Sequence, residues 1–303
     1  MTPRVLRMAA FGLLLTSASG CGILQRRALA DDGAIPSCLF IVNSDTPPPA
    51  DVRDVAEKLG FRRVLLVMAH LLPEKLGGVE KARQYVAEIR GRGDAALLVG
   101  AHVYMCPPGA TKDSAKSVFE AHWSRLADTY NAVGFDWVYM DGMEEPTVDN
   151  IRPGALALLS KLRPKPRWRQ GSAYMNVNDL IDETGQVDWM QPQRVAQFRG
   201  DTKALLNSDL ERCRAELKQA VASRHAPQMG WLPLSKLGKS RGEDEEPFSP
   251  SLEQWKRLLS VAREYRAALC IRGTVQRMKA ELLKDDVLPL LREYEAWRMS
   301  GAP

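Results

Sequence analysis

This sequence has few histidines, few aromatic residues and only a small net charge. Only 4 of its 303 residues are histidine, 7% are aromatic, and the formal net charge is +5. That charge excess is too small to predict nucleic-acid binding. No H-x-H or H-E-x-x-H motif occurs, so we expect no bound metal. No G-x-G-x-x-G follows the first expected strand, which argues against the usual dinucleotide-binding fold, and we expect no cofactor.

The cysteines form no C-x-x-C motif of the kind used in metal or redox sites. Cys38 and Cys270 fall in the first and the last expected strands, which would be neighbours in a closed barrel. An oxidising compartment permits disulfides. A disulfide between these two residues and a pair of buried thiols are therefore both compatible with the sequence.

The N-terminal segment differs in character from the rest. Arg4 and Arg7 precede a short apolar run at 8–15, and small residues then lead to Cys21. This run is too short for a permanent transmembrane helix and is typical of an export signal. The Ala-Ser-Gly-Cys sequence at 18–21 resembles a bacterial lipobox, which implies that Cys21 is lipidated and becomes the mature N-terminus.

We therefore expect a signal peptide at 1–20, a tether at 21–36, and a membrane-anchored lipoprotein in the periplasm or at the cell surface. The alternatives are cleavage after Ala30, which would give a secreted protein, and a buried N-terminal helix that is never removed.

From residue 37 onward, short apolar runs alternate with longer amphipathic ones. Continuous apolar strands are typical of parallel strands buried on both faces. Eight such β-then-α units predict a single-domain α/β fold, the (β/α)8 TIM barrel, over 37–300, with a doubly wound open sheet as the alternative. The expected strands lie at 38–42, 63–69, 95–104, 135–140, 171–175, 187–190, 228–232 and 268–271, and the last expected helix runs from 275 to 297.

Polar and aromatic residues follow most of the expected strands. The site of such a barrel is built where strands end in their βα loops, and sugar recognition needs polar partners for hydroxyls and rings for the apolar sugar face. We therefore expect a glycan to be bound by Asp45, His70, His102, Tyr104, Tyr174, Asn176, Gln191, Gln193, Trp231 and Arg272. His122 and His225 are expected on helices, away from this site.

The fourth expected strand carries the most specific local pattern, GFDWVYMDGMEE at 134–145. It resembles strand four of several glycoside hydrolase (β/α)8 barrels, and also uncharacterised bacterial glycosidase-like proteins that carry a YFDG-x-E sequence. The segment LREYEAWR at 291–298 looks like the last helix of those proteins. The resemblance implies that Asp141 ends strand four as a catalytic carboxylate, with Glu144 or Glu145 as its partner.

The sequence departs from these families in two places. The α-galactosidase-like enzymes take an acid from strand six, where this chain has Gln191 and Gln193. Other barrel glycosidases place a glutamate on strand seven, where this chain reads GWLPL. The sequence therefore predicts a glycoside hydrolase that uses a strand-four Asp/Glu pair. The alternatives are a non-catalytic carbohydrate-binding barrel and a hydrolase or lyase of another type.

Overall fold

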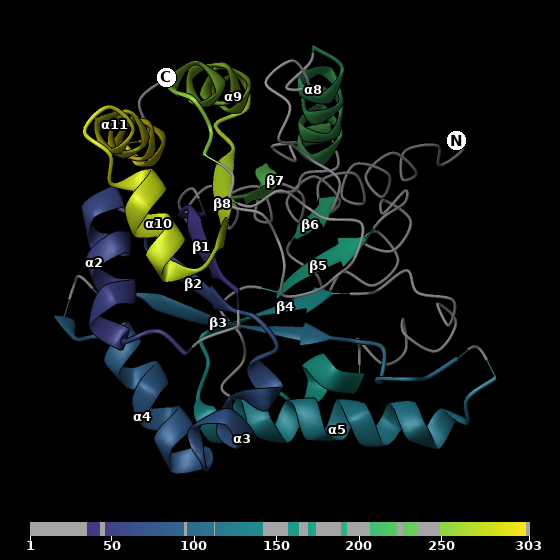
Figure 1. Cartoon of the computed structure of the whole chain (residues 1–303). Coiled ribbons are helices and arrows are strands. Elements are labelled where there is room, and N and C mark those ends of the chain that lie inside the picture. The colour runs from purple at the N-terminus through teal and green to yellow at the C-terminus, as the bar shows by residue number, and fades with distance from the viewer. Residues whose placement is uncertain are drawn as a thin grey trace, which may run out of the picture.

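The computed structural model describes residues 35–42, 46–93, 96–111, 113–141, 157–163, 169–173, 189–192, 207–222, 227–234 and 249–300 (Figure 1). The expected signal peptide and nearly all of the expected tether, Cys21 included, lie outside these ranges. Within them, no helix is long and apolar enough to cross a membrane.

Eight parallel strands form one sheet, and each occupies a segment that the sequence predicts within a few residues. Their spatial order is β6-β5-β4-β3-β2-β1-β8-β7. The strands are β1 (Cys38–Ile41), β2 (Arg63–Leu66), β3 (Leu98–Tyr104), β4 (Trp137–Asp141), β5 (Arg169–Ala173), β6 (Trp189–Pro192), β7 (Gln228–Pro233) and β8 (Ala268–Gly273).

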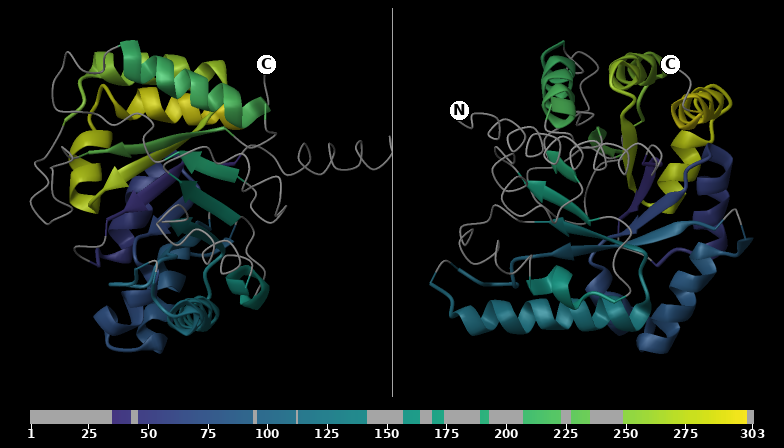
Figure 2. Two further views of the ribbon diagram at one scale, coloured as in Figure 1. Left: turned by 90° about the vertical axis from the view of Figure 1, so that its right-hand side faces the viewer. Right: turned by 180° about the vertical axis from the view of Figure 1, so that it is seen from behind.

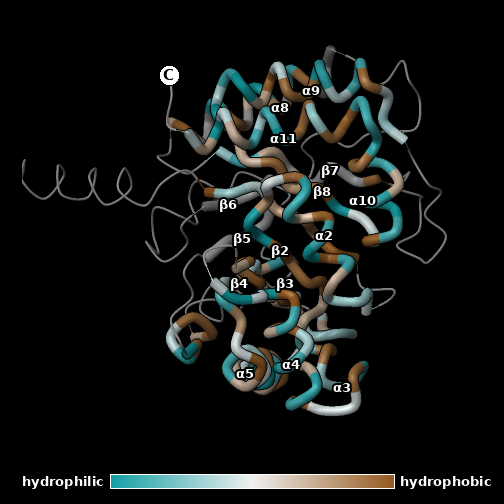
Figure 3. The backbone as a smooth tube through the Cα atoms, turned by 90° about the vertical axis from the view of Figure 1, so that its left-hand side faces the viewer, coloured by the Kyte–Doolittle hydropathy of each residue, from teal (hydrophilic) through white to brown (hydrophobic). Residues whose placement is uncertain are grey.

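Helices follow the strands and cover the outside of the sheet, as Figures 1 and 2 show. They are α2 (Pro49–Leu59), the 3-10 helix η1 (Ala69–Leu71), α3 (Leu72–Leu76), α4 (Val79–Arg90), α5 (Lys116–Val133), α8 (Asn207–Ala222), α9 (Leu252–Glu264), α10 (Val275–Leu282) and α11 (Leu288–Met299). Hydrophobic and hydrophilic residues are interspersed along the helices (Figure 3), and on α2 the buried residues Val52, Val55, Ala56 and Leu59 recur every three or four positions, which gives that helix an apolar side.

The sheet curls until its first and last strands are neighbours. β1 pairs with β2 on one side and with β8 on the other, with Cys38 opposite Cys270. β6 and β7, at the two ends of the strand order, also come into contact. The prediction of a (β/α)8 barrel with β1 beside β8 is therefore confirmed, and the doubly wound alternative is wrong.

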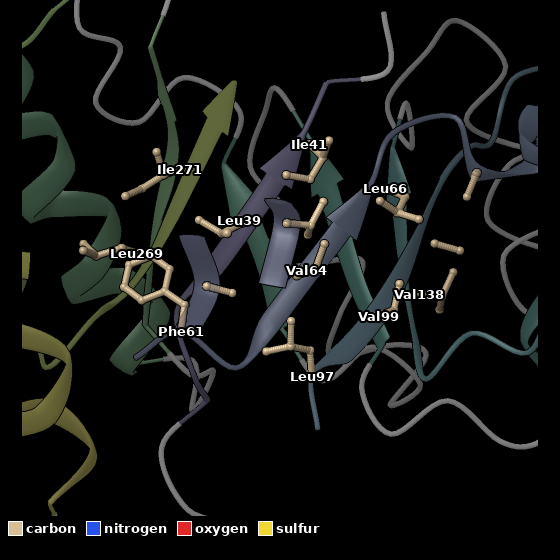
Figure 4. Close-up of a cluster of buried hydrophobic side chains, with 14 of the residues drawn as sticks. Leu39, Ile41, Phe61, Val64, Leu66, Leu97, Val99, Val138, Leu269 and Ile271 are labelled. Atoms are coloured by element: carbon tan, nitrogen blue, oxygen red, sulfur yellow. The ribbon is translucent and has the colours of Figure 1, made fainter. Parts of the chain in front are cut away.

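Both faces of the strands are buried, which explains their continuous apolar sequences. Alternate residues such as Leu39, Val64 and Val138 point outward into the layer beneath the helices (Figure 4). The intervening residues, among them Phe40 and Tyr139, form a second cluster. Because successive side chains of a strand face opposite ways, this second cluster fills the inside of the barrel.

Several expected boundaries differ by two or three residues, and two of the differences have a clear physical cause. The last helix, expected at 275–297, is two helices, because Pro289 in the first turn of α11 has no N–H to continue α10 and its ring would clash with the preceding turn. The second strand ends at Leu66 rather than Ala69, because Met68 adopts a left-handed conformation with a φ of 50°.

A buried polar cluster closes the N-terminal end of the barrel. Glu295 on α11 accepts hydrogen bonds from the Ser37 backbone N–H at 2.8 Å and from the Ser37 hydroxyl at 2.6 Å, and it pairs with Arg298. The Ser37 hydroxyl oxygen in turn accepts from the backbone N–H of Leu269 on β8. The LREYEAWR segment thus contributes a structural ion pair that fastens the start of β1 to α11 and β8.

Gly100 makes room for the side chain of Trp137 inside the barrel. It lies opposite Trp137 in the β3–β4 ladder, and the indole N–H of Trp137 donates to the Leu98 carbonyl at 3.1 Å. A Cβ atom added at Gly100 would lie 2.3 Å from the indole ring, well inside any real contact. The absence of a side chain at this position is therefore a packing requirement.

We expect Gly100→Ala to lower the free energy of unfolding by about 1–3 kcal/mol, because the indole must move or the strands must part. Gly273→Ala is the matched control, since its Cβ would meet only Leu234 atoms at 3.5 Å or more. Urea denaturation of both variants tests this. Equal losses for the two variants would contradict the packing account.

Candidate functional site

Asp141 is the last residue of β4 and lies at the C-terminal rim of the barrel. It pairs in register with Tyr104, the last residue of β3, and it is 7% exposed. The next residue after β3, Met105, donates its N–H to the Asp141 carbonyl at 2.9 Å and so extends the ladder. The carboxylate is therefore carried on rigid backbone at the end where barrel enzymes hold their catalytic groups.

His102 holds the Asp141 carboxylate from the neighbouring strand. Its Nε2 lies 3.0 Å from Asp141 Oδ2, and its Nδ1 accepts from the Met68 backbone N–H at 3.4 Å. Since Nδ1 is the acceptor, we assign the proton of the neutral ring to Nε2, which donates to the carboxylate. This hydrogen bond and the position at the end of β4 hold the Asp141 carboxyl group in a fixed orientation.

The backbone at Met68 is adapted to this contact. A non-glycine residue with a positive φ is uncommon and costs of order 1 kcal/mol or more. Here the left-handed turn ends β2, begins η1 and directs the Met68 N–H toward His102. Such local strain persists only where surrounding contacts fix it, and it is concentrated at functional sites.

Aromatic packing fixes the His102 ring as well. The ring is stacked on Tyr139 with centroids 5.3 Å apart, and it lies 5.5 Å from the ring of Phe40. His102 is buried, and both of its nitrogens have protein partners. We therefore revise the expectation that His102 binds sugar: the structure makes it a support for Asp141.

A second pair of histidines lies beside this strand end. His122 on α5 donates from Nε2 to the Tyr104 carbonyl at 2.8 Å, and its ring packs edge-on against that of His70 at 6.1 Å. The expectation that His122 lies away from the site is therefore wrong. Its helix packs against η1 and so brings the ring to the rim of the barrel.

Both of these rings are neutral at neutral pH. Burial, assisted by His122, Arg125 and His102, lowers the pKa of His70 to about 4. Burial also lowers the pKa of His122, although its hydrogen bond to the Tyr104 carbonyl opposes the shift. His70 is half-buried, and within the described ranges its Nδ1 has no hydrogen-bond partner. Among the described residues, no three His, Cys, Asp or Glu side chains are grouped to hold a metal ion.

The glycine-phenylalanine-aspartate opening of the strand-four motif belongs to the opposite end of the barrel. Gly134 ends α5 with a φ of 82°, and Phe135 is buried. Asp136 Oδ2 accepts from the Val99 N–H at 2.9 Å and from Arg90 at 3.1 Å. These residues set the start of β4, and of the part of the motif that the structure describes, 134–141, only Asp141 lies at the rim where chemistry is expected.

The structure describes some of the other predicted site residues and not the rest. Arg272 is half-buried on β8, opposite Phe40 in the β1–β8 ladder. The backbones of Gln191 and Trp231 form part of β6 and β7. The remaining predicted residues lie outside the described ranges: Asp45, Glu144, Glu145, Tyr174, Asn176 and Gln193.

A polar cavity of about 300 Å³ lies on the outside of the barrel, where α2 meets the end of α4. Arg53, Glu57 and Arg90 line it, and Asp141 does not. Its lining comes from helix surfaces and not from strand ends, so we do not assign the site to it. The expected catalytic role of Asp141 and the expected glycan contact of Trp231 both stay predictions.

Comparison with known proteins bears on the fold. The sequence matches no protein-family model and no curated protein sequence. Solved structures do match. A GH113 β-1,4-mannanase superposes with a TM-score of 0.57 and 10% identity over 87% of this chain and 99% of that one.

Two further matches have the same character. A chitinase from Bacteroides thetaiotaomicron gives a TM-score of 0.56 and 10% identity over 88% of this chain and 97% of that one. An endo-β-1,4-mannanase from Thermotoga petrophila gives a TM-score of 0.57 and 8% identity over 89% of this chain and 78% of that one. At these identities the likeness shows the fold alone: the chain has the (β/α)8 barrel that these enzymes share.

Proposed function

We propose that this protein is an exported glycoside hydrolase whose reacting carboxylate is Asp141. One observation carries the proposal: a buried carboxylate ends β4 at the C-terminal rim and accepts a hydrogen bond from a histidine whose own orientation is fixed. The barrel fold shared with mannanases and chitinases supports a carbohydrate substrate.

The chemistry follows from charge development at the sugar. Cleavage of a glycosidic bond passes through an oxocarbenium-like transition state, which a fixed negative charge beneath the ring stabilises. Asp141 would supply that charge, either as nucleophile or as electrostatic stabiliser. His102 is the positioning residue, because its N–H keeps the carboxylate oriented without contacting the substrate.

The leaving oxygen needs a proton from a second carboxyl group. We assign this role to Glu144, with Glu145 as the alternative, because both follow Asp141 within one short turn of chain. A separation of about 5 Å between the two carboxyls would give retention, and about 6.5–9.5 Å would give inversion.

The surrounding rim supplies candidate sugar contacts. His70 is neutral and half-buried, so it can exchange hydrogen bonds with a hydroxyl without carrying charge. Tyr104 ends β3, and Arg272 is the residue before last of β8, in the same sheet. Tyr174, Asn176, Gln191, Gln193, Trp231 and Asp45 complete the proposed glycan site.

A carbohydrate-binding barrel without catalysis is the second candidate. It is favoured by the glutamines at 191 and 193 and by the GWLPL sequence of the seventh strand, where related enzymes carry acids. The two candidates share the fold and the partner, and they differ in whether Asp141 takes part in bond cleavage.

We expect Asp141→Asn to lower turnover of a cleavable glycan by at least about 100-fold, the scale of losing one preorganised electrostatic contact. Asparagine keeps an oxygen that can accept from His102, so thermal unfolding should change little. Reducing-end release from β-1,4-mannan and chitin oligosaccharides, with circular dichroism melting curves, measures both quantities.

Asp136→Asn is the matched control, because it changes the same side chain at the other end of β4. It should lower stability through the Arg90 contact and leave turnover per folded molecule unchanged. A wild type that binds these glycans and cleaves none would favour the binding-barrel candidate. Equal turnover in Asp141→Asn and wild type would remove Asp141 from the chemistry.

We further propose that the mature chain begins at Cys21 and is anchored to the membrane by lipid. The consecutive positive segment, apolar run and Ala-Ser-Gly-Cys sequence support this. Intact-mass spectrometry of the membrane fraction should find an acylated chain that starts at Cys21, and Cys21→Ser should abolish acylation. A water-soluble product that starts at Asp31 would show simple secretion instead.

A further inference from the structure

Two cysteines face each other across the seam where the barrel closes. Cys38 on β1 and Cys270 on β8 are partners in the parallel ladder, and each is 1% exposed. Both belong to the cluster that fills the inside of the barrel, with Phe40 and Trp137. In the structure both are thiols.

Their spacing is compatible with a covalent bond. Neighbouring strands lie about 4.7–4.9 Å apart, which falls within the Cα separation of about 4.4–6.8 Å that disulfides span. Ladder partners also point to the same face of a sheet, so the two sulfurs lie on one side. The other two described cysteines, Cys106 and Cys213, belong to the outer hydrophobic layer.

A buried arginine lies beside this pair. Arg63, the first residue of β2, is fully buried and donates to the Pro36 carbonyl and to Gln228 Oε1, each at 2.6 Å. Its guanidinium also lies over the Trp137 ring, 5.0 Å from the centroid. These contacts hold a positive charge inside the barrel next to the two sulfurs.

That charge changes the chemistry of the thiols. Burial alone would raise the pKa of Cys38, but a hydrogen bond with Cys270, the Arg63 charge and a backbone hydrogen bond at Leu65 together hold it below its ordinary value. The thiolate is the form that attacks a disulfide. The Arg63 charge beside Cys38 therefore favours its thiolate, and Cys38 lies opposite Cys270 in the ladder.

We propose that Cys38 and Cys270 form a dithiol–disulfide pair that locks the β1–β8 seam when the chain folds in the presence of a disulfide oxidant. The Cys270 thiolate first attacks the oxidant while the seam is open, which forms a mixed disulfide and releases one thiolate. The Cys38 thiolate then attacks the Cys270 sulfur as β1 pairs with β8 and expels the second thiolate. Two electrons and both thiol protons pass to the oxidant, which leaves as two thiols.

The burial of both sulfurs is compatible with oxidation during folding. Because both residues are almost completely buried, reagents reach them while the seam is open and not in the closed barrel. A bond there would join the two ends of the barrel domain, where it removes much conformational freedom from the unfolded chain. It does not depend on the proposed enzymatic function.

The experiment is refolding of the full chain from urea in mixtures of reduced and oxidised glutathione. The sample is quenched with acid, alkylated in denaturant without reduction, digested and mapped by mass spectrometry. We expect a Cys38–Cys270 linked peptide, while Cys106 and Cys213 are alkylated. The oxidised protein should melt several degrees higher than the same sample after reduction.

Single variants separate the cross-link from packing. Cys38→Ala and Cys270→Ala should each melt at one temperature whether or not reductant is present, whereas Cys106→Ala and Cys213→Ala should keep the redox-dependent difference. If Cys38 and Cys270 in the wild type are alkylated as fully as Cys106 and Cys213, or are linked to other cysteines, the proposal is wrong. Because the peptide map uses the wild type, this outcome stays decisive even if a variant fails to fold.

Discussion

The pairing of β1 with β8 is the constraint from which the remaining architecture follows. It turns a sheet of sequential parallel strands into a curled barrel, so that all strand ends of one kind meet at one rim. The seam is held by backbone hydrogen bonds, such as that from the Val42 N–H to the Gly273 carbonyl at 3.0 Å, and by the Ser37–Glu295 contacts beneath it. Closure also encloses the interior of the barrel, where the apolar Phe40 and the charged Arg63 are both buried.

The candidate site depends on side chains packed in the barrel interior. His102 can hold Asp141 because its ring is stacked on Tyr139 and lies against Phe40, and because the left-handed turn at Met68 supplies a donor to its other nitrogen. Without this support a buried carboxylate would be costly. The site is therefore a buried carboxyl group that a histidine on the neighbouring strand holds in one orientation, at the rim where the strand ends converge.

Much of the fold follows from the sequence, because buried parallel strands have continuous apolar runs that are easy to recognise; the eight strands and the position of Asp141 were predictable in this way. The position of His122 was not, because helical periodicity predicts the face of α5 but not how far that helix extends along the barrel. The support of Asp141 by His102 required the backbone conformation of Met68, for which the local sequence has no signal. The break before α11 did have a sequence signal, Pro289. The amphipathic pattern continues across it and therefore favoured a single helix.

The central claim is that Asp141 acts on a sugar bound at the C-terminal rim. A crystal structure of the Asp141→Asn variant with a bound mannan or chitin oligosaccharide tests it most directly. The account predicts a sugar ring over residue 141, with its anomeric carbon facing that side chain and with His102 still hydrogen-bonded beneath it. A sugar bound elsewhere, for example in the cavity between α2 and α4, with residue 141 sealed inside the barrel, would contradict it.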